Sequence, residues 1–169
     1  MPRLCQIELN KLPKQLQMKK ESPIIIPEKI RIASIKTIRG IIEAPDDVDL
    51  EDDCVFSVEF NTESGLSLED KVVRFVLTVN ISANDPHGNP LPVQASYTHQ
   101  FIFKIDNLDD FVNTENGLEL DFLMGATLAG IALSSVRGII LTRTQGTPFD
   151  GFILPVIDPK QLILADKKV

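Results

Sequence analysis

The strongest constraint on this chain is a run of 15 residues without a charged side chain, from Phe122 to Val136. A helix that spans a bilayer needs about 20 apolar residues, and Arg137 ends this run too early. Runs of this length are typical of buried helices, so we predict no membrane insertion. The surrounding pattern extends the predicted helix over residues 118–144.

Small residues recur inside this helix at three- and four-residue spacings, which place them on one face. Such a face allows another backbone to approach closely. One thin sheet and one very apolar helix also leave more apolar surface than a single subunit easily covers. Both features predict a homo-oligomer. The predicted interface consists of Gly125, Ala129 and Ala132.

Upstream of the helix, apolar residues recur at every second position, as in strands with one buried face. The pattern predicts four strands near residues 30–41, 56–60, 73–82 and 93–106, with a bulge near Gly40. No helical pattern of useful length separates them, so the sheet should be antiparallel. Short helices are expected at 107–113 and after Pro159. The predicted fold is α+β, with a four-stranded antiparallel sheet followed by a long helix and a short C-terminal helix.

The net charge of −7 is unevenly distributed along the chain. Residues 1–39 carry nine Lys and Arg against three Glu, whereas residues 40–169 carry eight against 21 Asp and Glu. We interpret residues 1–28 as a basic N-terminal extension of a single domain at 29–169. The acidic domain argues against nucleic-acid binding. Two distant cysteines and the lack of an apolar leader pattern favour the cytoplasm.

Residues that often carry catalysis or bind metals form no recognisable site in this sequence. The acidic segment around Asp46 and Glu51 lacks the Gly that a calcium loop needs at its turn. His87 falls in a turn, His99 falls on the apolar side of a strand, and no phosphate-binding loop is present. We therefore expect no metal, no cofactor and no enzymatic activity.

Aromatic and apolar residues flank a proline-punctuated segment after the long helix. Apolar residues along irregular backbone must be covered, or must cover something else, which is typical of a binding protein. These residues predict a groove for unfolded polypeptide, with ordinary core packing as the alternative for each. The candidate groove residues are Phe56, Phe60, Tyr97, Phe101, Phe149, Phe152 and Leu154.

Short motifs in a fixed order carry a family resemblance across residues 30–165. They are Glu43-Ala44-Pro45, Phe101-Ile102-Phe103, Arg137, Gly146-Thr147 and Leu154-Pro155-Val156. In this order they resemble the SecB family of protein-export chaperones. The spacing from Arg137 to Gly146 differs from the family's usual spacing and implies an insertion or deletion there.

The resemblance implies a dimer of dimers, assembled through the long helix, that holds non-native polypeptides without ATP. It also implies that residues 146–158 help to form the client groove. Family members that bind the SecA motor use an acidic sheet surface, and Glu43 matches one acidic position. Arg39 and Ser96 occupy two others, so we expect binding to SecA to be weak or absent. The predicted function is an ATP-independent holdase. A chaperone dedicated to a toxin–antitoxin pair or another client, or a carrier of a small apolar ligand, remains as an alternative.

Overall fold

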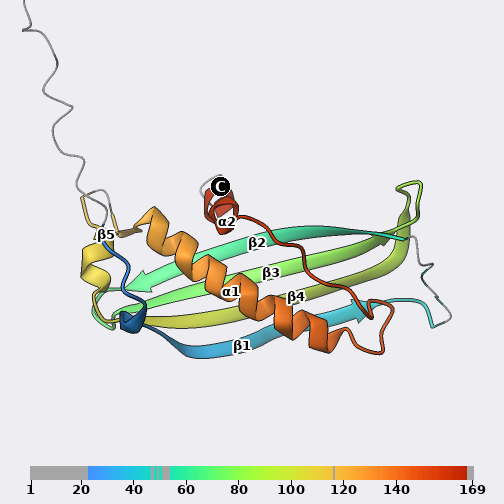
Figure 1. Cartoon of the computed structure of the whole chain (residues 1–169), viewed down its shortest axis with the longest axis horizontal. Helices are drawn as coiled ribbons and strands as arrows, with labels where there is room; N and C mark the ends of the chain where they lie inside the picture. The colour runs from blue at the N-terminus through green and yellow to red at the C-terminus, as the bar shows by residue number, and fades with distance from the viewer. Residues whose placement is uncertain (1–22, 47, 49, 51–53, 116, 167–169) are drawn as a thin grey trace, which may run out of the picture.

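One antiparallel sheet of four long strands forms the base of the structure, which is a computed structural model. It describes residues 23–46, 48, 50, 54–115 and 117–166. The strands are β1 (Ile30–Glu43), β2 (Val55–Ser67), β3 (Val72–Asn84) and β4 (Pro90–Ile105). Their order is β1-β4-β3-β2, so β1 and β2 occupy opposite edges. The helices α1 (Phe122–Arg143) and α2 (Pro159–Asp166) lie on one face of this sheet (Figure 1), which confirms the predicted fold class.

The alternating pattern of β4 determines which face of the sheet is buried. All seven residues that the sequence places on one side of this strand are at most 4% exposed. These residues are Val93, Ala95, Tyr97, His99, Phe101, Phe103 and Ile105. We call this side the inner face, and the opposite side the outer face.

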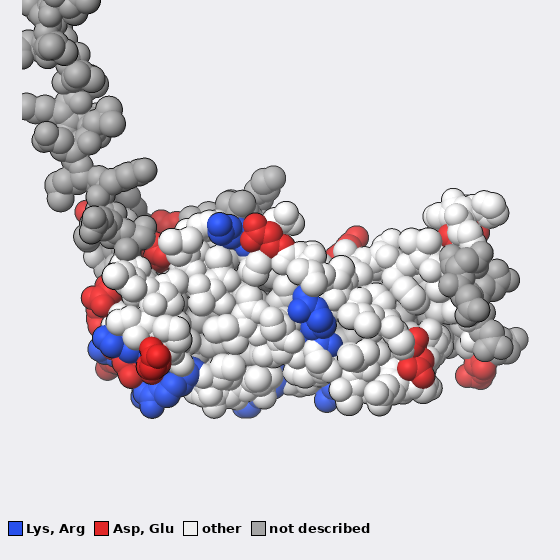
Figure 2. All heavy atoms as spheres, in the orientation of Figure 1, with Lys and Arg blue, Asp and Glu red and all other residues white. Residues whose placement is uncertain are grey.

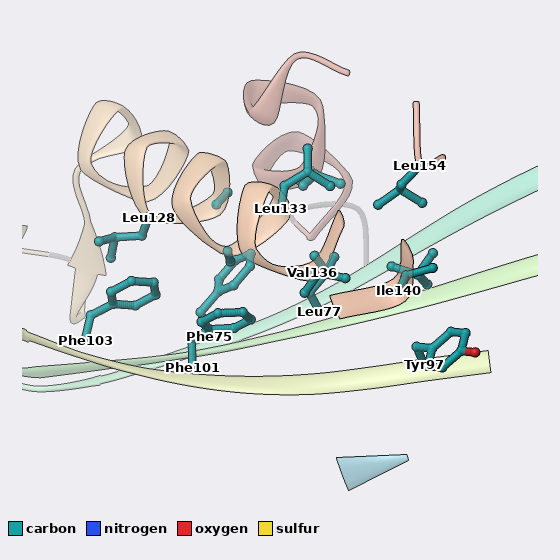
Figure 3. Close-up of a cluster of buried hydrophobic side chains, with 14 of the residues drawn as sticks. Phe75, Leu77, Tyr97, Phe101, Phe103, Leu128, Leu133, Val136, Ile140 and Leu154 are labelled. Carbon is teal, nitrogen blue, oxygen red and sulfur yellow. The ribbon is translucent and has the colours of Figure 1, made fainter. Parts of the chain in front are cut away.

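Helix α1 covers the inner face where β3 and β4 run side by side. The Asp121 side chain caps its N-terminus by accepting hydrogen bonds from the backbone N–H groups of Leu123 and Met124. Leu128, Val136 and other apolar side chains of α1 point toward the aromatic side chains of the sheet (Figure 3). By length and composition α1 could cross a membrane, but nine of its residues are buried in the subunit, as in a core helix.

The edge strand β1 contains the bulge that the sequence predicts. Its register against β4 shifts between Ile32 and Ser34 and again between Thr37 and Arg39, next to Gly40. Bulges bend an edge strand and increase its twist. As a result, consecutive isoleucines of β1 do not all point to the inner face.

The segment between β4 and α1 differs from the prediction of a single short helix at 107–113. A 3-10 helix, η3 (Leu108–Phe111), leads into a two-strand hairpin of β5 (Val112–Asn113) and β6 (Glu119–Leu120). Because β6 occupies residues 119–120, α1 begins at Phe122 instead of residue 118. The predicted helix after Pro159 is confirmed as α2. A further 3-10 helix, η2 (Pro27–Lys29), precedes β1.

The basic extension is only partly described. Residues 1–22 lie outside the described residues, as do Asp47, Asp49 and residues 51–53 of the acidic segment. The division at residue 28 therefore stays a prediction.

Candidate functional site

Three phenylalanines from distant parts of the chain form one aromatic cluster. Phe56 projects from β2, and its ring centroid lies 5.6 Å from Phe149 and 5.2 Å from Phe152. Phe149 and Phe152 come from the segment after α1 and lie 6.4 Å apart in an edge-to-face arrangement. Such tilted and edge-to-face contacts are the favoured geometries of aromatic pairs. Phe149 and Phe152 are buried, whereas Phe56 is only half-buried.

The segment that brings two of these rings to the sheet is held by specific polar contacts. We call residues 146–156 the post-helix strip. Gly151, with φ of +78°, allows the backbone to turn directly before Phe152. Arg137 of α1 then donates from Nε to the Leu154 carbonyl oxygen at 3.0 Å and from Nη2 to that of Pro155 at 3.2 Å. One guanidinium therefore ties the end of the strip to the helix.

Open depressions lie on both sides of the post-helix strip. One, of about 550 Å³, lies beside β2 and includes Phe56, Phe152 and Ile153 in its walls. The other, of about 570 Å³, separates Gly146 and Pro148 from the loop after β1. Ile153 is 64% exposed and Val156 is 88% exposed. The strip therefore presents apolar side chains beside concave surface.

The surface around these depressions carries few charges. Figure 2 shows the side of the molecule with α1, where uncharged residues cover most of the area. Acidic and basic groups are visible at the two ends, along the upper and lower edges, and, as one basic group, near the middle. Within this surface, Ile153 and Val156 of the post-helix strip are the exposed apolar residues that could contact an apolar segment.

Other predicted groove residues lie elsewhere. Tyr97 and Phe101 are 2% and 0% exposed and pack beneath α1 (Figure 3), so both are core residues of the subunit. Phe60 is half-buried on the inner face of β2. Leu154 is buried at the end of the strip that Arg137 holds. The structure thus joins Phe56, Phe149 and Phe152, and we do not carry Tyr97 and Phe101 into the proposed groove.

The predicted interface residues of α1 also lie inside the subunit. Ala129 and Ala132 are completely buried in the core. Gly125 faces α2, where a β-carbon at this position would lie 3.7 Å from the Ile163 side chain. The small residues therefore let the sheet and α2 approach α1 closely, and a subunit interface needs other residues. A charge at Ala129 would disrupt the core before it could split an assembly.

Glu43 and the two positions compared with it lie together on the outer face. Arg39, Glu43 and Ser96 line one depression of about 370 Å³ between β1, β4 and β3. Gln94 donates a hydrogen bond to the Glu43 carboxylate from the neighbouring strand. This face is separated from the aromatic cluster by the thickness of the sheet.

The two histidines are placed as the sequence predicts. His87 is exposed in the turn before β4, and His99 is buried on the inner face. Burial lowers the pKa of His99, and the nearby Arg143 lowers it further. Among the residues that the structure describes, no group of three potential metal ligands comes together. Much of the acidic segment lies outside them, so the absence of a metal stays a prediction.

Sequence reasoning missed several residues of the site. Cys54 and Val58 line the depression beside β2, yet neither stands out in the sequence as a groove residue. The function of Arg137 in holding the strip had a visible signal. It is the first charged residue after a long uncharged run, and an isolated cation in a buried helix needs a polar partner.

The four-stranded sheet, the long helix and the short second helix together define a SecB-like fold. A solved structure of this class is the SecB-like chaperone Rv1957 of Mycobacterium tuberculosis, in complex with a ChAD peptide from the Rv1956 HigA1 antitoxin. The TM-score is 0.58, and the match covers 78% of this chain and 92% of that chain at 10% sequence identity. No family model and no curated protein matches this sequence. At this identity the likeness establishes the fold, and the function has to be argued from the site.

Proposed function

We propose that this protein is an ATP-independent holdase that binds apolar segments of non-native polypeptides between β2 and the post-helix strip. The observation that carries the proposal is the aromatic cluster with its open side, where Phe56 is half-buried and Ile153 is exposed beside a depression. Covering about 400 Å² of apolar surface would contribute about 10 kcal/mol before the ordering costs of the client. Burial of this size supports reversible binding without nucleotide hydrolysis.

The same fold in the mycobacterial chaperone accommodates a peptide from an antitoxin, which supports a polypeptide as the ligand. The client of this chain is then either a range of precursor proteins for export or one dedicated partner such as an antitoxin. The site favours neither, because apolar burial is not selective by itself. A small-ligand carrier is less well supported. The cavity near Leu66, Phe75 and Leu128 measures about 220 Å³, below the usual range of about 300–1,000 Å³ for ligand pockets.

We also propose that the protein works as a cytoplasmic homo-oligomer, arranged as a dimer of dimers. The support comes from the edge strand β1, whose isoleucines remain exposed in the subunit. Ile32, Ile35, Ile38 and Ile41 are between 39% and 57% exposed. An exposed apolar edge is a liability unless another chain covers it. Light scattering at micromolar concentration should therefore show a dimer or tetramer, and a stable monomer would contradict this part of the proposal.

The client site can be tested without disturbing the core. Phe149 and Phe152 are buried, so serine substitutions there would test folding as well as binding. Ile153→Asp changes an exposed residue beside the depression, and Ile24→Asp is a matched control at a residue that is 82% exposed.

The assay measures aggregation of a chemically unfolded client on dilution, without ATP. Ile153→Asp should raise the protein concentration that is required for the same protection about tenfold. Ile24→Asp should behave like the unmodified protein. Equal protection by both variants would place client binding elsewhere. A strict requirement for ATP would contradict the holdase proposal as a whole.

A further inference from the structure

The outer face of the sheet carries basic side chains in a chain whose net charge is −7. The strand register places Lys36 and Arg39 of β1, Lys104 of β4 and Arg74 of β3 on this face. Lys36 is the partner of Gln100, and Arg74 is hydrogen-bonded to that same glutamine. We call these four residues the outer cationic strip. It covers three neighbouring strands, although the four residues are far apart in sequence.

These cations have no carboxylate partner among the described residues. The two ion pairs that the described residues form are Arg31 with Asp106, at 2.8 Å, and Lys71 with Asp109, at 3.3 Å. Arg31 is also the cross-strand partner of Lys104. Like charges at directly opposed positions destabilise a sheet. Sheet stability therefore does not explain why positive charge is concentrated here.

The surface beside the strip has Val76 and Ile102 at its centre, and hydrogen-bonded polar side chains around them. Thr78 and Thr98 are hydrogen-bonded across the strands at 3.1 Å, and Ser96 donates to the Asn80 side chain at 2.9 Å. Arg74 uses its Nε to donate to Gln100 at 2.8 Å. Because this contact uses only one of the five N–H donors of the guanidinium, the others can bind a carboxylate. Side chains that already pair with one another lose little freedom when a ligand binds.

Carboxylates border the strip and limit how an anion can lie on it. Glu59 and Glu63 are on β2 at the far edge of the same face, and Glu43 is at the end of β1. The depression of about 370 Å³ has Arg39 in its wall, with Glu43 and Glu59 at the other sides. A bound anion is attracted toward β1 and β4 and repelled from β2. Charge patterns of this kind fix the register of a partner more than they raise its affinity.

We propose that the outer face binds a short acidic segment of a partner protein through carboxylate contacts with the outer cationic strip. A nucleic acid fits less well, because residues 40–169 carry 21 acidic against eight basic side chains and the bordering glutamates would face its phosphates. The proposed surface lies on the opposite side of the sheet from the aromatic cluster. It can therefore be occupied while a client is bound, and it does not depend on the proposed holdase activity.

The test uses the full chain and a fluorescein-labelled peptide of alternating Glu and Ser, with a Gln-Ser peptide as its neutral counterpart. Fluorescence anisotropy at low ionic strength should show binding of the Glu peptide alone, and added salt should weaken it. Lys36→Gln with Arg39→Gln removes two positive charges from the strip and should raise Kd about tenfold. Lys160→Glu on α2 changes the net charge by the same two units, and its Kd should stay within about twofold of the unmodified protein.

Several outcomes would overturn the proposal. These are failure to bind the Glu peptide, equal binding of the Gln peptide, and an equal loss of affinity in both charge variants. Tighter binding of a single-stranded oligonucleotide, lost in Lys36→Gln with Arg39→Gln, would show that the strip is a nucleic-acid surface. Aggregation suppression by the same double variant should be unchanged. This readout separates failure of the outer surface from failure of the client site, and thermal unfolding confirms that the variants are folded.

Discussion

The two faces of the sheet are built from alternate residues of the same strands, yet they have opposite chemistry. On the inner face of β4, Phe101 and Phe103 are fully buried beneath α1. On the outer face of the same strand, Gln100 and Thr98 form cross-strand hydrogen bonds beside solvent. The inner face supplies the core that fixes the fold, and the outer face is free to vary in charge. The difference separates the face that stabilises the fold from the face that we propose for partner binding.

Adjacent residues of β4 offer the sharpest way to break this comparison. Phe101→Ala on the inner face should lower the free energy of unfolding by about 3–5 kcal/mol, because it removes a buried ring and leaves a cavity. Gln100→Ala on the outer face removes one exposed hydrogen bond and should cost at most about 1 kcal/mol. Urea denaturation of both variants checks the pair. Equal costs would show that the outer face is also covered, for example by another subunit.

A smaller effect is expected where the inner face meets the post-helix strip. Arg137→Ala removes two hydrogen bonds to the carbonyl groups of Leu154 and Pro155 and should cost about 1–3 kcal/mol. Hydrogen exchange should show faster exchange in residues 149–156, with little change in the centre of the sheet. Arg137→Lys keeps the charge but lacks the planar fork of donors that reaches both carbonyl oxygens, so it should recover only part of the protection.

Full protection of the strip in Arg137→Ala would contradict this assignment. It would mean that the contacts between Phe56, Phe149 and Phe152 hold the strip without help from α1. Client binding by Arg137→Ala would then show whether the proposed groove needs the contacts of Arg137.

The sequence predicted the faces of the sheet better than it predicted the site. Period-two alternation identifies the inner residues of β4 because successive side chains of a strand point to opposite faces. It does not show which inner residues a helix covers. Tyr97 and Phe101 lie under α1, whereas Phe56 lies under the shorter strip, and this depends on packing between distant segments. The β5–β6 hairpin was missed because two-residue strands are too short to show a period.

The small residues of α1 show the same limitation. Their spacing predicts a close approach; Gly125 lies against α2 and Ala129 is fully buried in the core. The spacing cannot tell whether the approaching backbone belongs to the same subunit. In the structure the contact of Gly125 is with α2, through Ile163. Whether a small-residue face contacts its own subunit or another one therefore has to be decided by structure or by experiment.

The inner face also contains a polar exception whose effect depends on pH. His99 is fully buried, stacks on Tyr97, and neither of its ring nitrogens has a hydrogen-bond partner among the described residues. Burial lowers its pKa below the ordinary histidine value of 6.5, with a further contribution from Arg143. Above about pH 6.5 the imidazole is neutral in both the folded and unfolded states, and its contribution to stability is complete. As pH falls toward the lowered folded-state pKa, the unfolded chain binds the proton first and the protein loses stability.

Thermal unfolding between pH 7.5 and 5 should show this loss, and His99→Leu should reduce it. His87→Gln changes the exposed histidine in the turn and serves as the control, which should retain the dependence. If His99→Leu shows the same pH dependence as the unmodified protein, another group controls it.

The smallest effect is expected on the outer face, where binding to the SecA motor should be weak. In the sequence resemblance to the SecB family, Arg39 and Ser96 align with acidic positions of the members that bind SecA, and both lie in one depression with Glu43. Arg39→Asp with Ser96→Glu lowers the net charge by three units and should strengthen SecA binding a few-fold, most clearly at low salt. Lys160→Glu with Gln145→Glu makes the same change in net charge away from this depression and should have no such effect.

The Arg39→Asp and Ser96→Glu variant should also lose affinity for the acidic peptide, because the same surface cannot favour both partners. Tight, salt-sensitive SecA binding by the unmodified protein would contradict the expected weak SecA binding. It would also show that the positive charge of the outer cationic strip does not determine which partner the outer face binds.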